Sequence, residues 1–220
     1  MKKKYLLLAI VAASLANNAW ADGTGSFDAG VKLGTLGFGV EVNYPLNSYL
    51  TVAVGLNKFS KSRTDTIDNN DYKENIDLKT LSLLLNFHPF AGSFRLTAGA
   101  MINNNELSLK AEPNATYDIN GTLYSAAQVG KLEANVDFHK FAPYAGIGFG
   151  HSASSGLGFT LDLGVMMQGK PNVDLSSTGG VLSNDATFQS ELKKEEANAE
   201  DDIKDFTVYP VVSVGLNYRF

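Results

Sequence analysis

The sequence predicts an all-β fold: an eight-stranded, antiparallel, up-and-down transmembrane β-barrel, with a short amphipathic helix in its last extracellular loop. Three observations predict it. Apolar and polar residues alternate in many segments, which is the period of a strand with one apolar face. The alternation in Val212–Phe220 runs to an aromatic C-terminal residue, as expected of a strand that closes a barrel. The N-terminal residues have the pattern of an export signal.

Residues 1–21 are predicted to be a cleaved secretory signal peptide. Lys2, Lys3 and Lys4 precede an apolar stretch from Leu6 to Leu15, and Ala19-Trp20-Ala21 fits an A-x-A cleavage site. The apolar stretch is too short for a membrane-spanning helix. We therefore expect the mature chain to begin at Asp22, with residues 22–220 forming one barrel domain.

Composition excludes several classes of protein. Removal of the three signal lysines takes the formal charge from −5 to −8, which argues against nucleic-acid binding. The chain has no cysteine, so it forms no disulfide. Mean hydropathy is −0.07, far below that of a helical membrane protein but compatible with strands whose two faces differ.

The first two predicted strands form a tight hairpin. Residues 27–34 and 38–44 alternate on either side of Thr35-Leu36. This register places Lys32 roughly opposite Glu41 on the inner face. A turn at residues 45–48 leads to the next strand.

The third and fourth predicted strands are residues 50–57 and 76–88. The outward residues of the fourth strand are Leu81, Leu83, Leu85 and Phe87. Residues 59–75 between them are rich in Asn, Asp, Lys and Ser, so a loop is expected there.

The fifth strand is expected to start at Phe94, after a turn, and to continue to about Lys110. Residues 111–130, which contain Pro and Gly, are expected to form a loop. The sixth strand spans about residues 131–149, and its apolar parity switches between His139 and Pro143, which predicts a bulge.

The seventh and eighth strands are residues 159–168 and 206–220. Eight is an even number at the small end of the range for bacterial barrels. The connections after the third, fifth and seventh strands are long, and those after the second, fourth and sixth are short. This asymmetry predicts long loops outside the cell and both termini in the periplasm.

The long segment 171–205 contains the predicted helix. Phe188, Leu192, Ala199, Ile203 and Phe206 recur at helical spacing. Residues 189–205 hold seven acids and three lysines, a net charge of −4. Two interpretations stay open: a lid over the barrel mouth or a surface that attracts cations, and a solvated loop helix packed on the rim.

Five charged residues are predicted to line the barrel interior: Lys32, Glu41, Arg95, Asp162 and Arg219. The interior of an eight-stranded barrel is just wide enough for side chains to fill it, and buried charges must pair. One interpretation is an internal ion-pair network that plugs the barrel. The other is a narrow polar passage, for which inward glycines would leave room.

No catalytic or metal site is predicted, and no cofactor. His151 and Ser152 are adjacent, but neighbouring side chains on a strand or turn point apart, so adjacency does not make a nucleophile–base pair. The remaining histidines, His88 and His139, complete no metal-ligand spacing. We therefore expect a protein that is not an enzyme.

The C-terminal segment resembles the signal that the outer-membrane assembly machinery reads. The matching residues are Ser213, Gly215, Tyr218 and Phe220. This resemblance implies biogenesis with the barrel assembly machinery and periplasmic chaperones.

Several other motifs resemble the CarO-type barrels, among the small OmpA/OmpW-like porin-family proteins of Gram-negative bacteria. They are Thr35-Leu36-Gly37-Phe38-Gly39, Asn43-Tyr44-Pro45, the run Ala142–Phe149, the run Gly169–Leu175 and the closing Tyr218-Arg219-Phe220. The resemblance implies a monomeric eight-stranded barrel. CarO-type proteins are described as channels for basic amino acids, but no selectivity residue of theirs maps onto this chain.

These observations give two main functional hypotheses for an outer-membrane protein. The first is a small porin-like channel for passive passage of small polar or cationic solutes. The alternative is a structural or surface-interaction barrel with a filled interior. A third hypothesis is a soluble lipid-carrier barrel, in which the apolar faces of the strands would point inward. The expected partners are lipopolysaccharide outside and phospholipid inside, with no nucleic acid.

Overall fold

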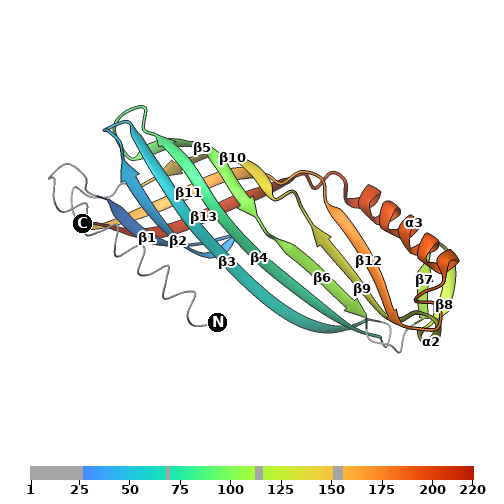
Figure 1. Ribbon diagram of the computed structural model, residues 1–220. Helices are drawn as coiled ribbons and strands as arrows, with labels where there is room; N and C mark the ends of the chain where they lie inside the picture. Colours follow the sequence, from blue (N-terminus) through green and yellow to red (C-terminus); the bar gives the residue numbers. More distant parts are fainter. Residues whose placement is uncertain (1–26, 68–69, 112–115, 151–155) are drawn as a thin grey trace.

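The computed structural model describes residues 27–67, 70–111, 116–150 and 156–220. Eight strands close into a barrel, and its wall continues at one end into an elongated lobe (Figure 1). The C-terminus lies at the barrel end away from the lobe. The predicted signal peptide and its cleavage residues, Ala19, Ala21 and Asp22, lie outside the described residues.

The barrel confirms the predicted fold class. Around the ring, each strand pairs with its neighbours in antiparallel register, and β4 pairs with β5 to complete the circle. In order around the ring, the strands are β1 (Asp28–Gly34), β2 (Gly37–Pro45), β3 (Leu50–Ile67), β4 (Asn70–Phe87), β5 (Phe94–Asn103), β10 (Phe141–Phe149), β11 (Gly156–Met167) and β13 (Val208–Arg219). None of the helices in the described ranges has both the length and the apolar character to cross a membrane.

The outer surface of the barrel is an apolar belt. Its side chains include Leu33, Leu83, Ile147 and Leu163, all strongly exposed in the isolated molecule. Burial alternates along each strand, so the apolar residues face outward and the polar residues face inward. This arrangement is the reverse of a soluble carrier barrel and is typical of strands in lipid.

The β1–β2 hairpin is short, as predicted. Gly34 pairs with Gly37 across Thr35-Leu36. Gly37 has φ +92°, and a Cβ there would lie 2.5 Å from the Cβ of Phe59. The tight turn therefore requires glycine. The hairpin is shorter than the next two strands: β2 pairs with β3 only as far as Lys58, whereas β3 and β4 stay paired as far as Ile67 and Asn70.

The predicted loop at residues 59–75 is wrong. β3 and β4 are 18 residues long each and stay paired from Leu50–Phe87 to Ile67–Asn70. The far halves of these strands leave the membrane belt, so their outer face meets water and needs polar side chains. Their composition therefore resembles that of a loop.

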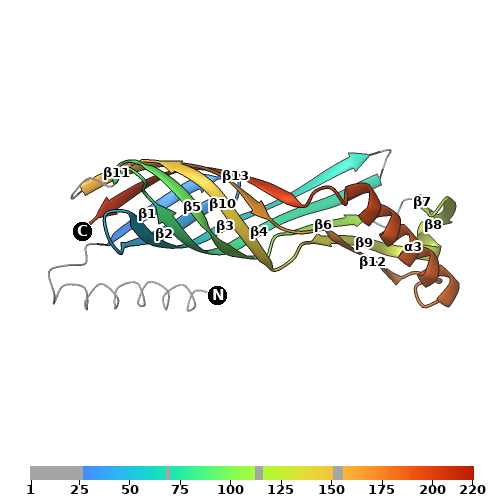
Figure 2. The same ribbon diagram turned by 90° about the horizontal axis from the view of Figure 1, so that it is seen from above.

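Three further strands extend this wall into the lobe. They are β6 (Glu106–Ala111), β9 (Gly130–Asp137) and β12 (Asn172–Gly179), and the order β3-β4-β6-β9-β12 is continuous (Figure 2). β6 follows β5 closely and pairs with the next part of β4, in line with the predicted continuation to about Lys110.

The predicted single strand 131–149 and its bulge are wrong. The chain forms two strands, β9 in the lobe and β10 in the barrel, which pair with different neighbours. The parity switch at residues 139–143 marks the passage from lobe to barrel. In the lobe the apolar residues of β9 face inward, whereas in the barrel most apolar residues of β10 face outward. The apolar parity of the sequence therefore switches between the two strands.

The two faces of the sheet exchange character where the wall leaves the belt. On β3 the outward residues change from Val54 and Leu56 to Lys58 and Ser60. Lys58 pairs directly with Lys79, which lies two residues before Leu81, the first outward leucine of β4. Beyond these lysines the outer face is polar, and the inner face begins with the apolar residues Phe59, Ile76 and Leu78.

A second hydrophobic core lies on the inner face of the lobe. The predicted loop 111–130 instead contains β7 (Thr116–Ile119), β8 (Thr122–Ser125) and α2 (Ala126–Val129), and this hairpin packs with α3 (Ala186–Ile203) against the sheet. The core residues are Ala111, Tyr117, Ile119, Val129, Phe188 and Leu192.

Helix α3 confirms the predicted helix, but it lies along β12 in the lobe and not over the barrel mouth (Figures 1 and 2). Asp185 caps its start by accepting a hydrogen bond from the Phe188 N–H at 2.9 Å. Glu196 and Glu200 accept hydrogen bonds from the backbone N–H groups of Leu175 and Val173. These acids cover the free edge of β12. An uncovered edge would present unpaired backbone groups with which another chain could pair.

Candidate functional site in the barrel interior

Four predicted interior residues meet in the middle of the barrel. Lys32 Nζ lies 2.5 Å from Glu41 Oε2 and 3.2 Å from Asp162 Oδ2. Arg95 donates a hydrogen bond from Nη2 to Asp162 Oδ1. The residues come from β1, β2, β5 and β11, so the Lys32–Glu41 pair joins neighbouring strands and each pair of Asp162 spans one intervening strand.

The register explains the diagonal contact between Lys32 and Glu41. Glu41 pairs with Gly30, two residues before Lys32 on the same face. Gly215 pairs directly with Lys32, and a Cβ there would lie 3.1 Å from Lys32 Cγ, so this glycine leaves room for the lysine side chain. The four charges sum to zero, and Glu41, Arg95 and Asp162 are each buried to more than nine-tenths. A neutral cluster of this kind satisfies charges that burial would otherwise penalise.

Inward glycines make room for this cluster and do not leave an open passage. A Cβ on Gly148 would lie 2.5 Å from Arg95 Nε and 2.6 Å from Asp162 Oδ1. A Cβ on Gly55 would lie 2.7 Å from Ser82 Oγ. The space above these glycines is thus filled by side chains from adjacent strands.

Arg219, the fifth predicted interior residue, lies in a separate group near the termini. Its Nη2 is 3.9 Å from Asp28 Oδ2, and Asn43 donates a hydrogen bond to Asp28 Oδ1 at 2.8 Å. Asp28 and Arg219 are directly paired on β1 and β13. Sequence reasoning missed Asp28 as the partner, although its inward parity was visible.

A polar cavity of about 360 Å³ opens at this end of the barrel. Its walls carry Asp28, His88 and Arg219, and it extends inward to Glu41 and Arg95. The charged cluster forms its floor. Beyond that floor a cavity of only about 40 Å³ separates the cluster from the next layer.

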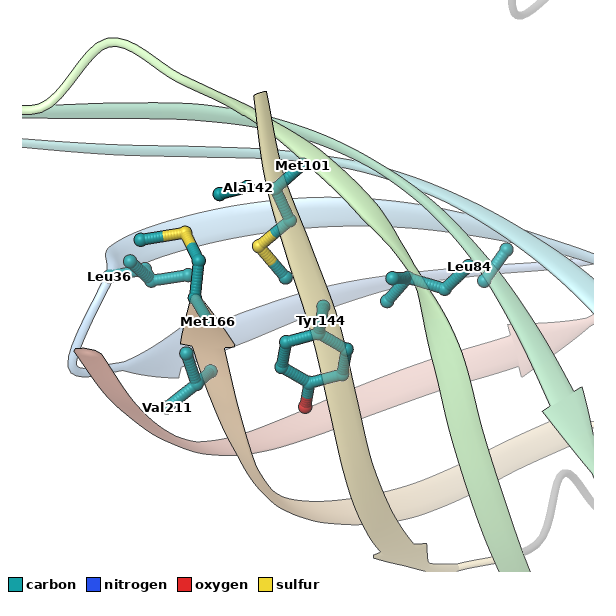
Figure 3. Close-up of a cluster of buried hydrophobic side chains, with 8 residues drawn as sticks. Leu36, Leu84, Met101, Ala142, Tyr144, Met166 and Val211 are labelled. Atoms are coloured by element: carbon teal, nitrogen blue, oxygen red, sulfur yellow. The ribbon is translucent and has the colours of Figure 1, made fainter. Parts of the chain in front are cut away.

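The next layer is an apolar plug inside the barrel, which the sequence analysis did not identify. Its side chains come from the β1–β2 turn and six strands of the wall, and they converge on the axis (Figure 3). They are Leu36, Ala53, Leu84, Met101, Ala142, Tyr144, Met166 and Val211. Leu84 interrupts the alternation between Leu83 and Leu85, and Met166 directly precedes Met167. Apolar residues at these inward positions could have indicated a buried apolar layer inside the barrel.

The assembly-signal residues occupy both faces of β13. Tyr218 and Phe220 point outward and are exposed, and the Phe220 ring stacks on Phe27 with centroids 5.0 Å apart. Ser213 and Gly215 are on the inward face; Ser213 Oγ lies 3.5 Å from Asp162 Oδ2. The role of these four residues in assembly stays a prediction.

The described residues contain no group of three side chains arranged to hold a metal ion. His88 lines the polar cavity, and His139 lies at the junction of barrel and lobe. His151 lies outside the described residues.

We predict that Arg95→Met lowers the free energy of unfolding by about 3–5 kcal/mol, because it leaves a buried carboxylate short of a partner. The double variant Arg95→Met/Asp162→Leu should cost less than Arg95→Met alone. Urea unfolding in lipid vesicles measures both. The exposed pair Lys110–Glu133, at 2.7 Å, is the control, and Lys110→Met should cost only about 0–1 kcal/mol. Equal costs at the two pairs would contradict a buried network.

We also predict that the lobe loosens in acid before the barrel does. Hydrogen bonds from Lys194 and Asn120 lower the pKa of Glu191, and a hydrogen bond from Lys110 lowers the pKa of Glu133, below the ordinary 4.5. Depressed carboxyl pKa values stabilise the fold above pH 4.5, and this contribution is lost as the pH falls through the lowered values. Amide exchange of α3 and β9, corrected for intrinsic rates, should therefore accelerate as the pH falls below 4.5. A Glu133→Gln/Glu191→Gln variant that keeps the full acid response would contradict this assignment.

Comparison with known proteins agrees with this architecture. No protein-family model and no curated protein sequence matches the chain. Among solved structures, CarO2 of Acinetobacter baumannii superposes with a TM-score of 0.58 at 25% identity, over 89% of this chain and 98% of that one. CarO of the same organism superposes with a TM-score of 0.56 at 23% identity, over 88% and 97%. The predicted resemblance is confirmed: the chain folds as a β-barrel similar to these two CarO structures.

Proposed function

We propose that this protein is an outer-membrane barrel that is closed in its resting state and serves to hold a folded lobe at the cell surface. One observation carries the proposal: two successive layers fill the barrel interior. The charged cluster fills the middle, and the apolar plug fills the half next to the lobe. This is the filled-interior alternative predicted from the sequence.

The two layers oppose solutes for different physical reasons. A polar solute that passes the charged cluster has to replace ion pairs at 2.5 and 3.2 Å with its own contacts. It then meets a dry layer of leucine, methionine and tyrosine side chains that offers few hydrogen bonds. Desolvation of polar groups in such a layer costs several kcal/mol.

The lobe supports the second part of the proposal. It has a core of its own, built from the sheet, α3 and the β7–β8 hairpin. Carboxylates of α3 also fix the hairpin, since Glu195 accepts from the Asn120 N–H and Glu191 from Asn120 Nδ2. Much of the helix's acidic charge is therefore used in structural hydrogen bonds, which favours the helix as a packing element of the lobe over a cation-attracting surface.

The porin-like channel stays a second candidate, favoured by the 360 Å³ cavity. The cavity brings water from the terminal end as far as Glu41 and Arg95. Conduction would then require movement of the remaining cluster and of Met101 and Met166. Methionine is the most adaptable apolar side chain, so such a movement is physically accessible.

The proposal includes an orientation and partners. Phe27, the C-terminus and the short turns at residues 46–49 and 88–93 lie at one end, and the lobe lies at the other. We place the terminal end in the periplasm and the lobe outside, as in other bacterial barrels. The apolar belt then contacts the acyl chains of phospholipid and lipopolysaccharide, and the barrel functions as a monomer.

Planar-bilayer recording of the refolded mature protein tests the closed barrel. We expect no reproducible conductance steps, while a known porin gives steps under the same conditions. A variant that empties both layers, Arg95→Ala/Met101→Ala/Met166→Ala, should conduct, because it opens a path from the polar cavity to the lobe. A heat-modifiable gel shift confirms folding of each protein. Regular steps from the unaltered protein would favour the channel.

A further inference from the structure

An apolar strip on the inner face of the lobe is exposed. Phe59, Leu107 and Leu109 are 40%, 37% and 41% exposed, and Ile76 and Leu78 are half-buried. Phe59 pairs with Leu78, and Ile76 pairs with Leu107, so these residues form one continuous patch across β3, β4 and β6. We refer to these five residues as the lobe strip.

The lobe strip is open because two elements stop short of it. The β1–β2 hairpin ends at Thr35-Leu36, and among the described strands none pairs with β3 on its β2 side beyond Lys58. Helix α3 packs on β12 and β7 at the opposite edge of the sheet. The strip between them is therefore accessible past the uncovered edge of β3, immediately on the lobe side of the apolar belt.

The strip has a cationic border. Lys61 pairs directly with Ile76, so it lies on the same face as the strip, and it is exposed. The next pair on this face is Arg63 with Glu74, whose charges oppose each other, so the strip and its border carry a net positive charge. On the opposite face, the row at the level of this junction is acidic, with Asp77, Glu106 and Asp137 in direct register. A negatively charged group would therefore bind at the inner face and avoid the outer one.

We propose that the lobe strip binds a long-chain fatty-acid carboxylate, with the acyl chain on Phe59, Leu78 and Leu107 and the carboxylate at Lys61. The strip spans three strands and about 13 Å from the level of Phe59 to that of Leu109, an area that suits one acyl chain and is too small for a protein interface. Ion pairs and the plug close the barrel below it, so the occupant enters from the side. The inference rests on the proposed function in one respect, namely that the lobe stands outside the bilayer.

A photoreactive fatty acid, with a diazirine near the chain end, tests the site in refolded mature protein in lipid nanodiscs. Peptide mass spectrometry after irradiation should find labels in Glu106–Ala111 and in residues 59–63, and excess oleate should suppress them. Leu107→Asp/Leu109→Asp should reduce this labelling by about tenfold, because a charged surface replaces the apolar contact. Leu123→Asp, an exposed leucine outside the strip, is the matched control and should label normally.

The headgroup contact has a separate readout. Lys61→Glu should raise the concentration for half-maximal strip labelling by about tenfold, while Lys131→Glu, another exposed lobe lysine, should not. A photoreactive alcohol of the same chain length should bind Lys61→Glu and the unaltered protein equally. Because Lys61 is an exposed side chain, this variant keeps the test valid if the leucine variant fails the gel-shift test for folding.

Three outcomes would overturn the proposal. They are labels confined to the apolar belt, strip labels that neither oleate nor the substitutions reduce, and a strip buried between two copies, detected as dimers by light scattering of the nanodiscs. None of them bears on the conductance recording, so failure of this inference and failure of the closed barrel can be told apart.

Discussion

The structure depends on one constraint: a single sheet continues from lipid into water without a break. Within the belt its outer face must be apolar, and beyond the belt the same face must be polar. Lys58 and Lys79, paired on β3 and β4, mark the change. The inner face changes in the opposite sense, from ion pairs in the barrel to the core of the lobe. Unbroken backbone pairing on both sides of this line keeps the lobe fixed relative to the barrel.

The filled interior follows from the small ring of strands. Eight strands leave room for side chains and little else, so inward residues must pack or pair. The layers then follow their surroundings: a polar cavity at the end with the termini, ion pairs in the middle and an apolar plug next to the lobe. The plug and the core of the lobe both lie on the inner face of the continuous sheet, and each is built from buried apolar residues.

The alternation of apolar residues predicted the ring of eight strands, because lipid imposes a strict period of two on their outward residues. The expected register of the first hairpin placed Lys32 near Glu41, and helical spacing in residues 188–206 predicted α3. The same reasoning failed at residues 59–75, because polar outward residues on a strand in water have the composition of a loop. It failed at residues 139–143, where a change of partner strand mimics a bulge. The apolar plug was missed because Leu84 and Met166 adjoin outward apolar residues, which hide inward ones from a period analysis.

Site-directed spin labelling along β3 tests the change of solvent most directly. The chain has no cysteine, so single cysteines at Val52, Val54, Leu56, Ser60 and Ser62 can be labelled without background. The account predicts that the first three labels collide more with oxygen than with a water-soluble nickel reagent, and that the last two reverse this preference while remaining as immobile as strand residues. Mobile labels at Ser60 and Ser62, or an oxygen preference that continues past Lys58, would contradict a sheet that passes from membrane to water at the paired lysines.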